Sequence, residues 1–91
     1  PISYLDWGEK LDTPAYGCIV VFTRVGGGHV GFVVGRRANG DLLVLGGNQG
    51  DAVNIRAFPT SRVSGYRWPA GEPRNTALLP AGDAATSTNE A

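Results

Sequence analysis

The stretch Arg24-Val25-Gly26-Gly27-Gly28-His29-Val30-Gly31-Phe32-Val33-Val34-Gly35 decides the fold of this 91-residue chain. Its three consecutive glycines predict a tight turn, and the apolar, β-branched run after them predicts a strand. The stretch also holds the only histidine of the sequence. Because an unperturbed imidazole titrates at a pH of about 6.5, a histidine where a strand begins is a candidate general base. The structural alternative for His29 is a turn or surface residue without a chemical role.

Composition limits the classes of function. The length fits one small domain, and the net charge of zero gives no electrostatic reason to expect nucleic acid or an acidic membrane as a partner. No apolar run approaches the roughly 20 residues of a membrane-spanning helix, and no stretch of these residues has the pattern expected of a signal peptide. The single cysteine excludes an internal disulfide and a multi-cysteine zinc site. We therefore expect no membrane insertion, and no metal or cofactor is implied.

The order of the apolar segments predicts an α+β fold. Residues 2–7 are expected to form a short helix that ends at Gly8, and residues 9–17 a connector. Alternating and β-branched segments then predict five short antiparallel strands in a curled sheet, or partial SH3-like barrel. These strands are expected over residues 18–24, 29–35, 41–46, 52–58 and 62–68. From residue 70 the composition becomes rich in Ala, Gly, Pro, Ser and Thr. Residues 1–69 are therefore predicted to be the folded part, and residues 70–91 a disordered, flexible tail or linker.

Turn positions predict which residues face each other. If Asn39-Gly40 forms a two-residue hairpin turn, Val34 lies opposite Leu45 and Asn48 becomes the diagonal neighbour of His29. Diagonal pairs lie about 7–8 Å apart, which is within reach of their side chains. An asparagine can hold an imidazole in one tautomer and orientation, so Asn48 is a candidate partner of His29. The alternative is that Asn48 is only a turn residue in its glycine-rich surroundings.

The first hairpin predicts where the only cysteine lies. With residues 25–28 as the loop, Arg24 faces His29 and Cys18 faces Gly35. Cys18 is then six residues along the strand from His29, or roughly 20 Å. At that distance no thiolate–imidazole pair forms, so we expect Cys18 to be a small buried apolar residue rather than a nucleophile.

Both faces of the central hairpin are apolar. One face carries Val20, Phe22 and Val33, and the other carries residues such as Ile19, Val30 and Phe32. Both faces need a cover, and the short N-terminal helix is too small to provide one of them. The sequence therefore predicts a missing layer, supplied by upstream sequence, a separate chain or a dimer partner. The first residue is Pro1 rather than Met, which fits a processed or divided protein.

Several segments resemble a known family when they are taken in order. They are Pro14-Ala15-Tyr16-Gly17-Cys18-Ile19-Val20-Val21-Phe22, Gly28-His29-Val30-Gly31-Phe32-Val33-Val34-Gly35, Leu45-Gly46-Gly47-Asn48-Gln49 and Gly65-Tyr66-Arg67-Trp68-Pro69. Residues 3–69 thereby resemble the C-terminal β-sheet half of papain-like cell-wall hydrolases of the NlpC-type and CHAP (cysteine- and histidine-dependent amidohydrolase/peptidase) superfamily. The resemblance implies that a thiolate attacks an amide bond of peptidoglycan and forms an acyl-enzyme.

The resemblance also implies roles for individual residues. His29 would be the general base and Asn48 the orienting residue, with Gln49 as a less favoured substitute. Arg24, Gln49 and Trp68 are candidates for binding the substrate, the peptidoglycan stem peptides. The implied location is secreted, periplasmic or bound to the cell wall, in a bacterial or phage protein.

The chain departs from the family pattern in one respect. No Trp-Cys pair precedes His29, and Cys18 occupies a strand position where the family commonly has Asp or another small residue. The nucleophile is therefore expected upstream of Pro1, in an N-terminal half or a second chain. Two alternatives remain open: a non-catalytic SH3-like module that binds wall peptides or a protein partner, and a complete enzyme that uses Cys18.

Overall fold

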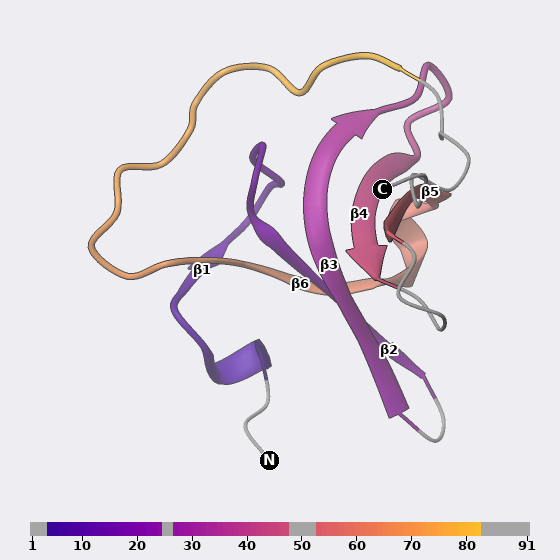
Figure 1. The fold of residues 1–91 in the computed structure, drawn as a ribbon. Coiled ribbons are helices and arrows are strands. Elements are labelled where there is room, and N and C mark those ends of the chain that lie inside the picture. The colour runs from indigo at the N-terminus through magenta and orange to yellow at the C-terminus, as the bar shows by residue number, and fades with distance from the viewer. Residues whose placement is uncertain (1–3, 25–26, 48–52, 83–91) are drawn as a thin grey trace.

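The computed structural model describes residues 4–24, 27–47 and 53–82 (Figure 1). Six strands form one antiparallel sheet in the spatial order β1-β6-β2-β3-β4-β5. In chain order, the elements are η1 (Tyr4–Asp6), β1 (Glu9–Leu11), β2 (Ile19–Arg24), β3 (Gly27–Arg36), β4 (Leu42–Gly47), β5 (Val53–Phe58), η2 (Thr60–Arg62) and β6 (Val63–Trp68).

The described residues contain strands and two single 3₁₀ turns but no α-helix, so the predicted α+β class is wrong. The expected helix over residues 2–7 is replaced by the three-residue turn η1. A helix of about six residues forms few backbone hydrogen bonds, and these do not offset the conformational entropy lost in ordering its first turn. Gly8 then takes a φ of 66° and redirects the chain into β1. The turn packs on β6, where a Cβ on Gly65 would lie 3.0 Å from the Leu5 side chain.

A sixth strand, β1, forms where the sequence predicts a connector. It pairs with β6 through Glu9–Trp68, Lys10–Arg67 and Leu11–Tyr66. Three residues are too few to show an alternating pattern, so the sequence gives no sign of this strand. Its inward side chain, Leu11, is buried in the core.

The hairpin of β2 and β3 is tighter than predicted. Arg24 pairs with Gly27, and Phe22 rather than Arg24 pairs with His29. The loop is shorter because Gly27 and Gly28 belong to the strand. At Gly28 the fit is close, since a Cβ there would lie 3.0 Å from the carbonyl oxygen of Phe22. The prediction that Arg24 faces His29 is therefore wrong.

The hairpin of β3 and β4 is also offset from its predicted register. Phe32, not Val34, pairs with Leu45, and a bulge interrupts the pairing between Val33 and Gly35. The turn spans residues 37–41 and is held by a bond from the Asp41 amide to the Asn39 side-chain oxygen (2.9 Å). The slip is two residues at Phe32 and Val33, which keeps these side chains on their predicted face, and one residue beyond the bulge, at Gly35 and Arg36.

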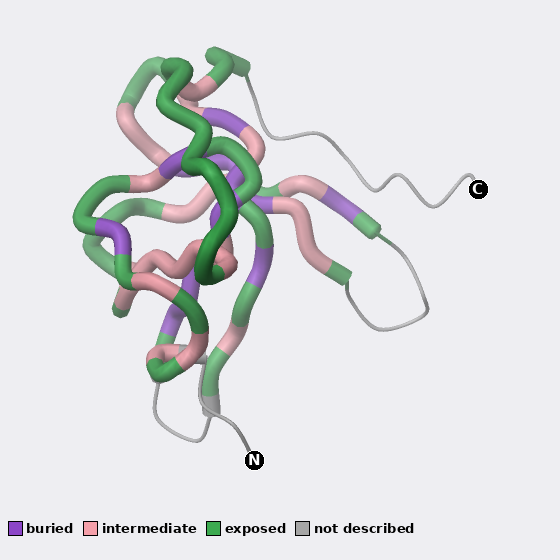
Figure 2. Tube along the Cα trace, turned by 90° about the vertical axis from the view of Figure 1, so that its left-hand side faces the viewer, coloured by how far each residue is buried: buried purple, intermediate pink, exposed green. Residues whose placement is uncertain are grey.

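The core lies on the inner face of the curled sheet, which we define by the buried residues Cys18, Val20, Phe22, Val33 and Val44. The curl brings β5 over this face. As a result, the Phe58 ring lies 4.6 Å from the Phe22 ring, although β2 and β5 are separated by two strands in the sheet. Most of the buried residues lie on β2, β3 and β4, and Figure 2 shows the buried stretches of the chain in purple.

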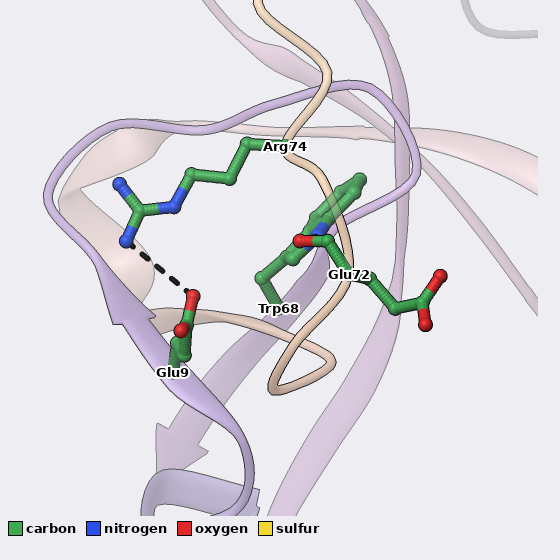
Figure 3. A network of polar contacts seen from close by, with 4 residues as sticks. All are labelled: Glu9, Trp68, Glu72 and Arg74. Carbon is green, nitrogen blue, oxygen red and sulfur yellow. Dashed lines mark hydrogen bonds and ion pairs between the residues drawn. The ribbon is translucent and has the colours of Figure 1, made fainter.

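Residues 70–82 leave β6 and run back across the molecule, as the orange-to-yellow part of Figure 1 shows. The Trp68 indole donates to the carbonyl of Glu72 (3.1 Å), and Arg74 pairs with Glu9 (3.5 Å; Figure 3). Farther on, the Arg36 amide donates to the carbonyl of Pro80 (2.9 Å) in a parallel bridge. These contacts hold the segment against β1, β3 and β6, although most of its residues are exposed (Figure 2).

Candidate active site

The single histidine lies near the tip of the β2–β3 hairpin, on an aromatic support. His29 is directly opposite Phe22, and the two rings stack at 5.9 Å with an angle of 20° between their planes. Phe58 completes the support with a ring 5.8 Å from the imidazole. The His29 residue is half-buried, so one part is held by the two phenylalanines while another part remains open to solvent. This arrangement fixes the plane of an imidazole without removing it from contact with a substrate.

On its other side, His29 lies over a glycine. A Cβ placed on Gly46 would be 3.8 Å from both Cε1 and Nε2 of the imidazole. Gly46 pairs with Asn54 on β5, and directly opposed residues have Cβ atoms about 4.5–5.5 Å apart. Asn54 is only 8% exposed and is the buried polar side chain of the described core. The absence of a side chain at Gly46 thus lets the imidazole lie close to β4, on the face where the neighbouring strand places the buried Asn54.

A cation covers the same aromatic pair. The Arg62 guanidinium carbon lies 5.3 Å from the Phe58 ring centroid and 6.0 Å from that of Phe22. Such positions over a ring face are favourable for a guanidinium, and the side chain is otherwise exposed. Arg62 therefore places a positive charge beside the support of His29, where it is available to a carboxylate.

The other predicted site residues fall into two groups. Asn48 and Gln49 lie outside the described residues. Arg24 pairs with Gly27, and Trp68 lies toward the opposite end of the sheet. Trp68 is five residues along β6 from Val63, the partner of Phe22, a distance of about 16 Å. The structure thus brings neither Trp68 nor the backbone of Arg24 to a position facing His29.

Cys18 is buried, with no exposed surface, as predicted. Its amide donates to the carbonyl of Ala15 (2.9 Å), and its carbonyl accepts from the amide of Val33 (3.0 Å). Because Val33 is four residues from His29 on β3, the thiol and the imidazole are about 13 Å apart along the strand. Desolvation raises the pKa of the Cys18 thiol, although a backbone hydrogen bond with Ala15 acts in the opposite direction. A buried, protonated thiol at this distance does not act as a nucleophile for His29.

Sequence reasoning missed Asn54, Phe58 and Arg62. The alternation in residues 52–58 predicts that Val53, Ile55 and Ala57 point inward, but Val53 is 43% exposed while Asn54 is buried. The burial is the reverse of the prediction because β5 folds over the inner face of the sheet and turns its Asn54 and Phe58 side toward the core. A phenylalanine on the otherwise polar side of the predicted strand was the one available signal.

No group of three His, Cys, Asp or Glu side chains that could share a metal ion occurs within residues 4–24, 27–47 and 53–82. In the same part of the chain, no helix has the length and apolar character needed to cross a membrane.

Comparisons with protein-family models, with curated proteins and with solved structures find no match for this chain.

Proposed function

We propose that this chain supplies the general base of a cysteine-dependent peptidase or amidase that cleaves amide bonds in the stem peptides of peptidoglycan. The observation that carries the proposal is His29, half-exposed, stacked on Phe22 and close to Gly46, whose strand partner is the buried Asn54. The ordered sequence motifs around His29 add the substrate class. The corresponding location is outside the cytoplasm, in a secreted, periplasmic or wall-bound protein.

In the proposed reaction, His29 takes the proton of a cysteine thiol, and the thiolate attacks the carbonyl carbon of the substrate amide. The imidazolium then gives that proton to the departing amine, which leaves an acyl-enzyme. In the second half, His29 takes a proton from the water that attacks the acyl group, and the imidazolium then returns this proton to the departing thiolate, which restores the thiol. Stacking on Phe22 keeps the ring plane fixed through both halves, and Arg62 is placed to attract a stem-peptide carboxylate.

We infer that the thiol comes from a polypeptide outside residues 1–91. Cys18 is the only cysteine of the sequence, and it is buried about 13 Å along the strand from His29. We also infer that Asn54 is a positioning residue that fixes the tilt of the imidazole. Asn48 stays a prediction for the same role.

The test is release of soluble peptides from purified peptidoglycan by the chain together with its thiol-bearing partner. His29→Ala is expected to lower the rate by 10²-fold or more, the usual contribution of a general base. Cys18→Ala is the matched control and is expected to retain the rate. Full activity of His29→Ala, or loss of activity in a folded Cys18→Ala protein, would contradict the proposal.

The role of Asn54 needs a readout beyond activity. Asn54→Ala is expected to lower kcat more than it raises KM and to displace the acid limb of the pH–rate profile, because a mobile imidazole is a poorer base. Asn54→Asp keeps a hydrogen-bond acceptor and is expected to restore part of the rate. An equal, pH-independent loss in both variants would indicate a purely structural role.

A second candidate function is a non-catalytic module that binds wall peptides or a protein partner. The exposed apolar side chains on the other face of the sheet favour it. This function predicts that the isolated chain binds purified peptidoglycan or a partner and that binding survives His29→Ala. Cleavage that depends on His29 would exclude it.

A further inference from the structure

The face of the sheet opposite the core carries a bounded apolar surface. Among its side chains, Val30 is 37% exposed, Phe32 50% and Val53 43%. Together with Ile19 and Leu45 they surround a hollow of about 320 Å³ whose base includes glycine backbone. We call this surface the outer patch. Contiguous exposed apolar side chains of this kind mark places where soluble proteins bind other molecules.

The chain itself covers the two sides of the outer patch but not its middle. On one side, η1 packs on β6 so that Leu5 lies over Gly65. On the other side, the segment after β6 covers Leu43, which is 5% exposed and close to Gly82. Between these covers, the surface is open. The shape is therefore a shallow site with two walls rather than a uniformly bare face.

One row of paired residues shows the charge of this face. Lys10 pairs with Arg67, Arg67 with Ile19, and Ile19 with Phe32. The row then continues through Leu45 to Ile55. Two cations thus stand at one end, and apolar side chains follow. In the described strands, no acidic residue occupies an outer-face position.

Arg67 places a half-buried cation at one end of the outer patch. Its Nε is buried, and no hydrogen-bond acceptor for it is found among the described residues. Because this nitrogen is enclosed by the chain, a carboxylate from outside would meet the charge of the guanidinium rather than the Nε itself, and a carboxylate is the acceptor that a guanidinium binds best. Arg67 and Phe32 are separated by two strand spacings, or about 10 Å.

We propose that the outer patch binds an acidic, apolar polypeptide segment that places large apolar side chains in the hollow beside Phe32 and a carboxylate on Arg67. A segment with these groups about 10 Å apart meets the requirement, for example at positions i and i+7 of a helix, which are about 10.5 Å apart. A second copy of this chain fits less well, because the described strands of its outer face carry cations and no carboxylate. The proposal does not depend on the chemistry of His29.

The test uses a labelled synthetic helical peptide with leucines along one face and one glutamate seven residues from the central leucine. A matched peptide carries glutamine in place of the glutamate. Fluorescence anisotropy is measured as each peptide is titrated with the whole 91-residue chain. The glutamate peptide is expected to bind at least tenfold more tightly than the glutamine peptide, as a charge-assisted bond provides.

Two variants assign the binding to the outer patch. Arg67→Gln is expected to abolish the preference for the glutamate peptide, whereas Phe32→Thr is expected to lower the affinity for both peptides at least tenfold. Phe32 is half-exposed, so the threonine variant keeps the fold, which circular dichroism verifies. The controls are Arg56→Gln, an exposed strand arginine, and Tyr16→Ser, an exposed aromatic in a loop; both are expected to bind as the wild type does.

Three results would overturn the proposal. The first is equal affinity of the wild type for the two peptides, or no binding of either. The second is a wild-type dimer in sedimentation that Phe32→Thr dissociates, because a second copy would then occupy the patch. The third is Phe32-dependent binding to phosphatidylglycerol vesicles without binding to the peptides, because the patch would then face a lipid surface.

Discussion

The burial of Cys18 makes the stability of this protein sensitive to alkaline pH in a defined way. Desolvation raises the pKa of the thiol above its ordinary value of 9.0. In the unfolded chain the thiol loses its proton at that ordinary value, whereas in the folded protein it keeps the proton to higher pH. The stabilising contribution of the protonated thiol is therefore complete below about pH 9. It is lost as the pH rises through the pKa of the folded state.

The expected magnitude follows from proton linkage. A difference of one bound proton changes the free energy of unfolding by about 1.4 kcal/mol per pH unit. This value is the upper limit of the slope from Cys18, which applies only where the thiol is ionised in the unfolded chain and still protonated in the folded protein. Burial and the nearby Cys18 also raise the pKa of Tyr66, from 10.0, so the tyrosine adds a second loss at higher pH. A variant without the thiol therefore separates the contribution of Cys18 from that of Tyr66.

The assay is urea unfolding at half-unit steps from pH 7 to pH 10, for the wild type and for Cys18→Ala. At pH 7 the alanine variant is expected to be less stable by about 1 kcal/mol, because removal of the buried sulfur atom leaves a small cavity. Between pH 9 and pH 10 its curve is expected to decline less steeply than that of the wild type, because only the contribution of the thiol is removed. Parallel curves for the two proteins, or rapid labelling of the native thiol by a disulfide reagent at pH 8, would refute the reasoning.

Three further changes have expected outcomes that thermal or urea unfolding can measure. Gly31→Ala is expected to destabilise the fold by about 1–3 kcal/mol, because the new Cβ would lie 2.5 Å from Cγ1 of Val44 in the packed core. Gly46→Ala is expected to change stability by less than about 0.5 kcal/mol, since its Cβ meets the His29 ring at an ordinary 3.8 Å. The same change is expected to move the NMR signals of that ring, and unchanged signals would place the imidazole elsewhere. Arg67→Met is expected to stabilise the isolated chain by about 1 kcal/mol, because it removes an unsatisfied buried nitrogen; a loss of stability would show that the guanidinium has a partner.

The parts of the fold that the sequence predicts are those that depend on local pattern. β2, β3, β4, β5 and β6 lie close to their predicted positions because alternating and β-branched residues mark them. Turn lengths are not marked in the same way. Gly27 and Gly28 serve equally in a turn or a strand, and only the packing of the hairpin decides between the two. The three-residue β1 exists because β6 offers it an edge, which is a property of the whole sheet.

In the candidate site, too, only the residues marked by a local feature of the sequence are predictable. His29 stands out as the only histidine, and the burial of Cys18 follows from its place in an apolar strand. The residues around His29 are a different matter. Phe58 lies at the end of β5 and Arg62 in η2, and both reach Phe22 only because the sheet curls. No spacing in the sequence encodes that approach, and only the three-dimensional structure reveals it.

The position of β6 between β1 and β2 has a consequence for how the chain folds during synthesis. β2, β3, β4 and β5 form a meander of neighbouring hairpins, which can pair as each strand leaves the ribosome. β1 is made first but has its pairing partner in β6, so it stays unpaired until Trp68 is made. Until then β2 also presents a bare edge, which is open to pairing with other chains. A nascent chain stalled before residue 63 is therefore the form of this protein most exposed to aggregation.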